Sequence, residues 1–133
     1  MSTLLELKQL TLNYKNYNTS VEVIKGIDLK INSSEKVAVV GKSGSGKTSL
    51  IMLMAGLEQP TSGEIIFDQQ LISTLNEDQL ADIRKKKIGI VFQSFYLIPN
   101  YTALEHVSLI LEINSIDNSK QKAEDLLIQF GLK

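Results

Sequence analysis

Eight consecutive residues have the types and the spacing of a loop that binds phosphate. They read Gly41-Lys42-Ser43-Gly44-Ser45-Gly46-Lys47-Thr48, a complete G-x-x-x-x-G-K-T pattern. Glycines allow the backbone to bend until several N–H groups point at one anion, and a helix that follows adds its dipole. Lys47 supplies a mobile positive charge for the β- and γ-phosphates, and the Thr48 hydroxyl is placed to ligate Mg²⁺. The segment therefore predicts a site for a nucleoside triphosphate with Mg²⁺, in which we include the neighbouring Ser49.

The alternative is a glycine-rich turn that arises by chance between a strand and a helix. A phosphate loop requires a strand before it and a helix after it. Lys36–Val40 is a short, β-branched and apolar run that predicts a buried strand, and a helix is expected from about Lys47 to Gly56. Apolar residues surround this helix, so we expect it to be buried. This context favours the phosphate loop, although the motif alone does not distinguish a kinase, a GTPase and an ATPase.

Predicted strands and helices alternate along the chain. Strands are expected at Leu4–Leu12, at Val21–Ile31 with an interruption at Gly26, at Gly63–Phe67 and at Ile88–Phe92. The alternation predicts an α/β fold in which the first strands are antiparallel.

Three amphipathic helices are predicted from their start signals. Thr74-Leu75-Asn76-Glu77 has the spacing of a capping box, and Thr102-Ala103-Leu104-Glu105 repeats it. Ser119 begins a last helix, and Gly131 stands where a C-cap glycine belongs. One face of this last helix carries Ala123, Leu126, Leu127 and Phe130.

Composition places the 133 residues among ordinary globular domains, with 43% hydrophobic and 22% charged residues and a net charge of −1. This charge does not predict a general affinity for nucleic acid. The run Arg84–Lys87 is interpreted as a solvated helix end rather than a basic patch. The absence of cysteine excludes disulfides and fits the cytoplasm. No apolar stretch is long enough to span a bilayer, so work at a membrane would need a partner.

The sequence resembles the nucleotide-binding domain of an ABC transporter over essentially its whole length. Tyr14, Gly41–Thr48 and Gln93 fall in the order and approximate spacing of that family. The stretch Ile88–Gln93, followed by Leu97-Ile98-Pro99 and Thr102–Glu105, is similar to the subgroup of macrolide exporters, lipoprotein-release ATPases and FtsE-like proteins. The resemblance implies a P-loop ATPase core with an N-terminal antiparallel β subdomain and the start of a helical subdomain.

The resemblance also implies roles for single residues. Tyr14 would stack on adenine, which its ring face allows; the alternatives are a strand-end tyrosine and a competing role for Tyr17. Gln93 would be the Q-loop glutamine, which contacts Mg²⁺ or the attacking water and senses the γ-phosphate; the alternative is a solvated loop glutamine. With Thr48 it would form the metal site, and with Lys47 the catalytic pair.

Partners follow from the same resemblance. The segment Phe95–Ile98 would be an exposed apolar patch unless a transmembrane permease covered it. A second nucleotide-binding domain would complete an ATP-dependent dimer. We therefore expect a cytoplasmic protein, peripheral at the inner face of the cell membrane, that powers export or extraction and does not bind nucleic acid.

Several family segments have no counterpart in the 133 residues: the signature, the Walker B strand with its catalytic glutamate, the D-loop and the switch histidine. Asp68 lies too soon after the loop for Walker B and is interpreted as a turn residue, and His106 as a surface or packing residue. We expect one incomplete domain, with a β region at 1–35 and 60–70, the loop with its strand and helix at 36–57, and the Q-loop with helices at 88–133.

Such a chain is expected to bind ATP with Mg²⁺ but not to hydrolyse it alone, because hydrolysis needs a positioned water and a base. Two other hypotheses stay open at this point. One is a non-catalytic nucleotide-binding module. The other is an ABC-type ATPase of DNA maintenance, which would carry a basic face or a coiled-coil insertion.

Overall fold

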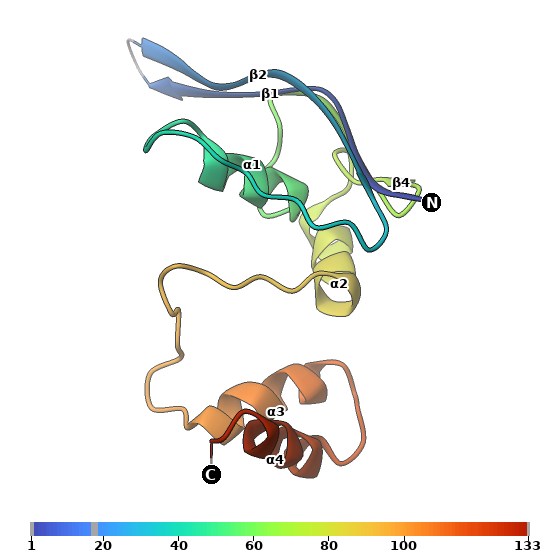
Figure 1. Cartoon of the computed structure of the whole chain (residues 1–133), viewed down its shortest axis with the longest axis vertical. Helices are drawn as coiled ribbons and strands as arrows, with labels where there is room; N and C mark the ends of the chain where they lie inside the picture. Colours follow the sequence, from blue (N-terminus) through green and yellow to red (C-terminus); the bar gives the residue numbers. More distant parts are fainter. Residues whose placement is uncertain (1, 17–18, 133) are drawn as a thin grey trace. The chain divides into compact units, whose positions relative to one another are not determined.

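The computed structural model describes residues 2–16 and 19–132 and divides the chain into two compact units. The N-terminal unit is Met1–Ile88 and the C-terminal unit is Gly89–Lys133. Figure 1 shows the strands and first two helices in the N-terminal unit, and the last two helices in the C-terminal unit. Each unit is considered by itself.

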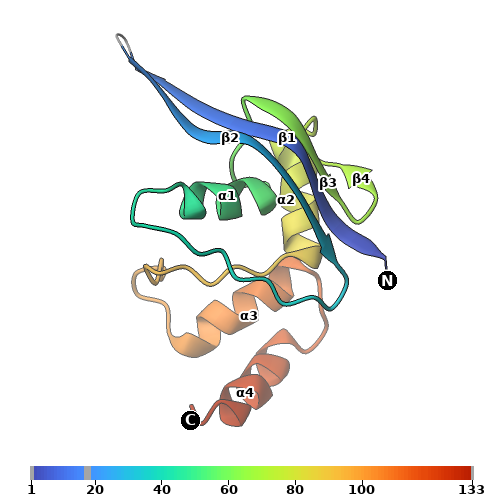
Figure 2. The ribbon, with the colours of Figure 1, turned by 45° about the horizontal axis from the view of Figure 1, so that its top comes forward.

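The N-terminal unit is built on a four-stranded sheet with the order β2-β1-β3-β4. Its strands are β1 (Thr3–Asn16), β2 (Thr19–Asn32), β3 (Ser62–Phe67) and β4 (Gln70–Leu71). Every neighbouring pair is antiparallel, and Figure 2 shows β1 and β2 as a long twisted hairpin. The predicted antiparallel β region is therefore confirmed in its strands.

An irregularity at Gln9 determines which side chains of β1 reach the core. Gln9 has a positive φ of 46°, and its backbone N–H donates a 2.9 Å hydrogen bond to Asp28 of β2. The pairing register shifts between Leu7 and Leu10, as a bulge does. Leu7 before the bulge and Leu10 after it are consequently both buried on the same side of the sheet.

Two helices, α1 (Lys47–Met54) and α2 (Glu77–Lys87), cover one face of this sheet (Figure 2). The fully buried part of the core combines β1, β2, α1 and α2 with Ile65 and Ile72. The helix α1 is shorter than predicted and is not buried all round. Leu50 and Leu53 face the core, whereas Ile51 is exposed.

The two segments predicted as buried strands are not strands. Lys36–Val40 and Ile88–Phe92 belong to no strand in the part of the chain that the structure describes. Val40 is 88% exposed and Val91 is fully exposed. A strand needs a neighbour that pairs with its N–H and C=O groups, and the described sheet pairs with neither segment. The prediction is therefore wrong for both.

The helix α2 begins later than its predicted cap. Asn76, not Thr74, is the N-cap, and its side chain accepts a 3.0 Å hydrogen bond from the backbone N–H of Gln79. The Gln79 side chain accepts in return from the N–H of Asn76, which completes a capping box. The run Arg84–Lys87 lies in the last turn of α2, where cations favour the helix dipole.

The C-terminal unit is a pair of packed helices, α3 (Ala103–Ile113) and α4 (Ser119–Gln129), after a long irregular segment. The predicted capping box of Thr102 and Glu105 is present. Gly131 has a φ of 75° and closes α4 as predicted. Of the predicted apolar face, Ala123 is buried, whereas Phe130 is exposed. None of the described helices is long and apolar enough to cross a membrane.

Candidate functional site

The loop Gly41–Thr48 lies between the segment Lys36–Val40, which is not a strand, and the first turn of α1 (Figure 1). Two of its glycines, Gly44 and Gly46, have φ values of 77° and 87°, which favour glycine over any other residue. Gly46 is the N-cap of α1 and carries no side chain that could cap it. The first N–H groups of the helix therefore remain available to an anion.

The ammonium group of Lys47 folds back over the loop. Its Nζ atom donates hydrogen bonds of 2.9 Å to the carbonyl oxygen of Gly41 and 2.7 Å to that of Lys42. A further bond of 3.2 Å, from the N–H of Ser45 to the Lys42 carbonyl, closes the turn. A positive charge is therefore held beside the uncapped end of α1, where both would act on the same phosphate chain.

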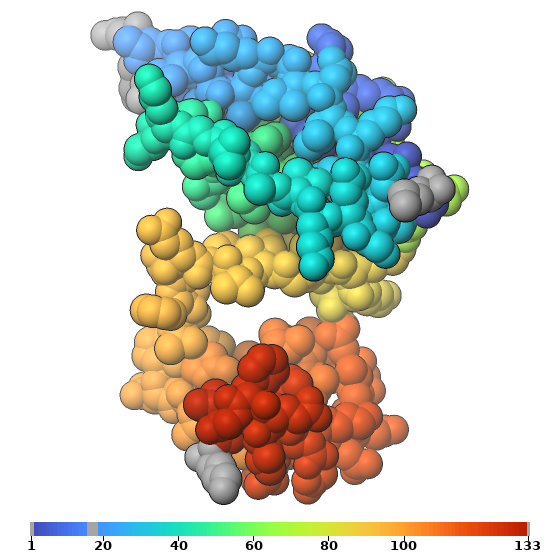
Figure 3. Space-filling model, viewed as in Figure 1, coloured from blue at the N-terminus to red at the C-terminus, as the bar shows by residue number. Residues whose placement is uncertain are grey.

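Close packing fixes where the loop lies on the N-terminal unit. A Cβ atom on Gly46 would lie 3.1 Å from both the carbonyl oxygen and the Cγ1 atom of Val23 in β2. This contact is tighter than most Cβ contacts and involves a backbone carbonyl that cannot rotate away, so it favours glycine here in addition to the positive φ. Most of the loop is nevertheless exposed, and Figure 3 shows this blue-green segment at the surface. Gly46 thus packs against β2, while most of the loop is accessible to a ligand.

Tyr14 lies on β1, opposite Val21 of β2, and its side chain is 45% exposed. Its hydroxyl donates a hydrogen bond to the carboxylate of Glu58, in the segment that follows α1. That bond, and to a smaller extent burial, raises the pKa of Tyr14 above its ordinary value, while a hydrogen bond with Ser49 acts in the opposite direction. Ser49, another predicted site residue, thus lies close enough to the Tyr14 hydroxyl to affect its pKa.

The remaining predicted residues are distributed as follows. Thr48 and Ser49 belong to the first turn of α1, and the Thr48 side chain is exposed. Gln93 lies in the C-terminal unit, in the exposed irregular segment before α3. Its role near Mg²⁺ and the attacking water stays a prediction from the sequence. Tyr17, the alternative to Tyr14, lies outside the described residues.

Sequence reasoning missed two residues that support the site. Glu58 has no motif of its own; only its nearness to the Tyr14 hydroxyl in the folded chain singles it out. Arg84 was considered only as part of a solvated run, yet its guanidinium is mostly buried and donates to the Gly56 carbonyl at the end of α1. Both contacts join residues far apart in the sequence, so a local pattern carries no signal for them.

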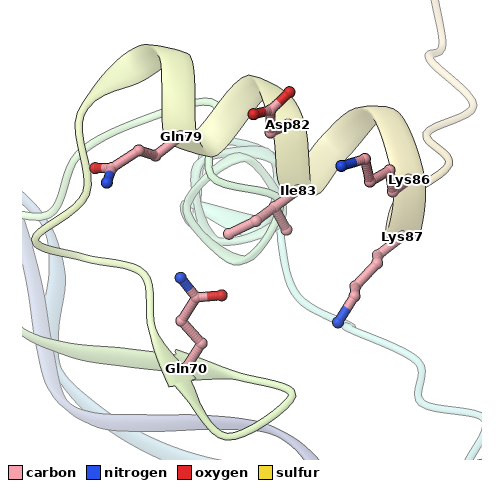
Figure 4. Close-up of a pocket in the computed structure, with 6 residues that line it drawn as sticks. All are labelled: Gln70, Gln79, Asp82, Ile83, Lys86 and Lys87. Carbon is pink, nitrogen blue, oxygen red and sulfur yellow. The ribbon is translucent and has the colours of Figure 1, made fainter. Parts of the chain in front are cut away.

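A hollow lies between β4 and α2, and Figure 4 shows its lining. The side chains around it are Gln70, Gln79, Asp82, Ile83, Lys86 and Lys87. None of them comes from the phosphate loop, and charges of both signs line the hollow. Among the described residues, no cluster of histidine and carboxylate side chains could hold a metal ion. The loop is therefore the better candidate for the functional site.

Comparisons with known proteins identify the family to which the chain belongs. A family model described as "ABC transporter" matches residues 24–133. The macrolide export ATP-binding/permease protein MacB of Pasteurella multocida is 41% identical over 132 residues, which are 98% of this chain and 20% of that protein. The lipoprotein-releasing system ATP-binding protein LolD of Idiomarina loihiensis is 39% identical over 98% of this chain and 58% of its own length.

A solved structure gives the same result at the level of the fold. The ATP-binding cassette MJ0796, a dimer bound to ADP and Pi in a post-hydrolysis state, superposes with a TM-score of 0.90 at 36% sequence identity. The match covers 98% of this chain and 58% of the cassette. The chain thus spans less than two thirds of the length of the cassette and of the LolD proteins.

Proposed function

This chain belongs to the ABC transporter family, and we propose that it binds ATP with Mg²⁺ through the loop Gly41–Thr48. The observation that carries the proposal is the ammonium group of Lys47, held by the Gly41 and Lys42 carbonyls beside the uncapped end of α1. A triphosphate that replaces these two carbonyls as the partner of Nζ gains a charge-assisted hydrogen bond.

The residues present fit the cation as well as the nucleotide. The Thr48 hydroxyl is exposed in the first turn of α1 and would be the protein ligand of Mg²⁺. The ion would neutralise phosphate charge. The half-exposed ring of Tyr14 would carry the adenine, since Ser49, at the start of α1, lies close enough to the Tyr14 hydroxyl to affect its pKa. Gln93 would position water or the ion, as the family resemblance implies.

For the complete protein we propose transport-coupled ATP hydrolysis. The chain spans 58% of the length of its LolD relative, so the further groups that hydrolysis needs are assigned to the whole protein. We propose that a transmembrane permease covers the exposed apolar side chains of Phe95, Tyr96 and Leu97, and that this docking holds the protein at the inner face of the membrane. The dimeric state of MJ0796 supports a second nucleotide-binding domain as a further partner.

Calorimetric titration tests the binding proposal directly. Mg·ATP is titrated into the chain, into Lys47→Ala and into Lys36→Ala, which removes an exposed lysine outside the motif. Loss of a hydrogen bond to a charged group costs about 1.5–3 kcal/mol, so Lys47→Ala should bind about ten- to a hundred-fold more weakly. Lys36→Ala should match the parent. Hydrolysis followed in the same samples should show no turnover.

The proposal is wrong if the parent does not bind Mg·ATP or if Lys47→Ala binds as tightly as the parent. Turnover that Lys47→Ala abolishes would instead show that these 133 residues already contain the hydrolytic groups.

A further inference from the structure

We infer that Glu58 is a positioning residue that holds the ring of Tyr14 as a platform for the nucleobase. The inference rests on the proposed function, because it concerns the base of the nucleotide whose phosphates the loop would bind. It adds a residue that lies outside the phosphate loop.

The Tyr14 hydroxyl joins two parts of the N-terminal unit, because Tyr14 comes from β1 and Glu58 from the segment after α1. Ser49, in the first turn of α1, lies close enough to affect the pKa of the same hydroxyl. The phenol O–H donates a hydrogen bond to the Glu58 carboxylate. A hydrogen bond to an ionised acceptor is about twice as strong as one between neutral groups. This contact therefore joins the ring to the segment that follows α1.

The segment that carries Glu58 is itself fixed to β1. The N–H of Thr61 donates a 2.9 Å hydrogen bond to the Thr11 carbonyl, and the N–H of Asn13 donates a 2.8 Å bond to the Thr61 hydroxyl. At its other end, the N–H of Leu57 bonds to the Met52 carbonyl of α1 at 2.9 Å. Because hydrogen bonds hold both ends of this segment, its backbone is fixed, and the half-buried Glu58 side chain can keep the phenol in one position.

The ring needs such support because nearly half of its side chain is exposed. An exposed side chain that becomes ordered on binding lowers the affinity, because it loses rotamer freedom. A hydrogen bond that already fixes the ring in the free protein removes much of this cost. The expected gain in affinity is about two- to ten-fold. It should appear only for ligands that carry a base.

A carboxylate near a binding site for polyanions also has an opposite effect, since it repels the phosphates. Without a positioning role, removal of the Glu58 charge should therefore leave ATP affinity unchanged or increase it. With that role, removal should weaken ATP binding. The sign of the change distinguishes the two cases.

The test compares Mg·ATP with Mg·tripolyphosphate, which offers the phosphate chain without a base. Both are titrated into the parent chain, Glu58→Ala, Glu58→Gln, Tyr14→Phe and the double variant Tyr14→Phe/Glu58→Ala. We expect Glu58→Ala to bind ATP about two- to ten-fold more weakly and tripolyphosphate as the parent does. Glu58→Gln keeps an acceptor oxygen and should lie near the parent. The double variant should be no weaker than Tyr14→Phe, because the two changes break one contact.

Each other outcome is informative. Unchanged or tighter ATP binding by Glu58→Ala overturns the inference, and so does an equal loss of tripolyphosphate binding. If Glu58→Ala does not fold, as judged by circular dichroism, Tyr14→Phe breaks the same hydrogen bond and should weaken the binding of ATP but not that of tripolyphosphate. A parent chain that binds tripolyphosphate and ATP equally well contradicts the base platform but not the phosphate loop. A parent that binds neither ligand contradicts the proposed function itself.

Discussion

The guanidinium of Arg84 donates a 2.6 Å hydrogen bond to the carbonyl oxygen of Gly56. Gly56 follows the last turn of α1 with a φ of 64°, and Arg84 lies in the last turn of α2, where it also pairs with Glu77. The bond therefore links α2 to the end of the helix whose other end begins at the phosphate loop.

We expect Arg84→Met to destabilise the N-terminal unit by about 1–3 kcal/mol, because the buried Gly56 carbonyl loses its partner while the aliphatic packing is kept. Urea unfolding followed by circular dichroism measures the change. Lys85→Met is the matched control, since the neighbouring Lys85 is exposed. Equal stability of the two variants would contradict the role given to Arg84.

Gly63 is the glycine at which an added methyl group should destabilise the sheet most. Its φ is 93°, and a Cβ atom there would lie 2.4 Å from the backbone carbonyl oxygen of Gln9. Neither atom can move without disturbing the pairing of β1 with β3. Gly63→Ala should therefore cost at least about 2 kcal/mol in thermal or urea unfolding. Gly89→Ala, which meets open space, should change little; a large effect there would show that the reason lies elsewhere.

The antiparallel sheet could be predicted from the sequence because its signals are local. The buried leucines of β1 stand at odd positions before Gln9 (Leu5 and Leu7) and at even positions after it (Leu10 and Leu12), so their spacing is compatible with a change of phase but does not show where the bulge lies. That bulge depends on Asp28, which accepts the Gln9 N–H from the neighbouring strand. A one-residue change of phase reverses which side chains point inward, so a contact between strands determines the second half of the inward face.

The start of α2 shows how two local signals can compete. Thr74 with Glu77 and Asn76 with Gln79 both fit the capping-box spacing, and the structure uses the second pair. Leu75 and Leu80, which pack in or against the core, then occupy the two positions of a hydrophobic staple. Burial, which is a property of the whole unit, selects the start of this helix.

The phosphate loop can be predicted from the sequence because its proposed function needs consecutive residues. The hydrogen bond between Tyr14 and Glu58 cannot be predicted in this way, since 44 positions separate the two residues. The strands expected at Lys36–Val40 and Ile88–Phe92 failed for a related reason. An apolar, β-branched composition indicates that a segment could form a buried strand. A strand also needs a neighbouring strand that pairs with its backbone, and the described sheet pairs with neither segment.

The capping box of α3 predicts a pH dependence in the C-terminal unit. The Glu105 carboxylate accepts hydrogen bonds of 2.6 Å from the Thr102 N–H and 2.8 Å from the Thr102 hydroxyl. The backbone bond first, and then the hydroxyl, hold the pKa of Glu105 below its ordinary value. A lowered folded-state pKa stabilises the helix above the unfolded value of about 4.3, and this contribution is lost as pH falls through the folded value.

A titration of Glu105 by residue-resolved NMR checks this. Thr102→Val removes the hydroxyl but keeps the backbone N–H, so the pKa of Glu105 should rise part of the way towards its ordinary value. An unchanged pKa would mean that the hydroxyl bond is not formed in solution. Glu105→Gln replaces the carboxyl with an amide that does not titrate. As the pH falls below about 4.3, the helix content of this variant should therefore change less than that of the parent.

His106 should hold the irregular segment of the C-terminal unit against α3. Its Nε2 atom accepts a 2.8 Å hydrogen bond from the N–H of Ile98, and its Nδ1 N–H donates a 2.8 Å bond to the Thr102 carbonyl. Loss of one such bond is worth about 0.5–1.5 kcal/mol, so His106→Ala should speed amide exchange at Ile98 about two- to ten-fold. Glu112→Ala, an exposed change on the same helix, should leave that exchange rate unaltered. If His106→Ala does not change the exchange rate at Ile98, other contacts hold the irregular segment. The arrangement of the apolar side chains of Phe95–Ile98 would then not depend on α3.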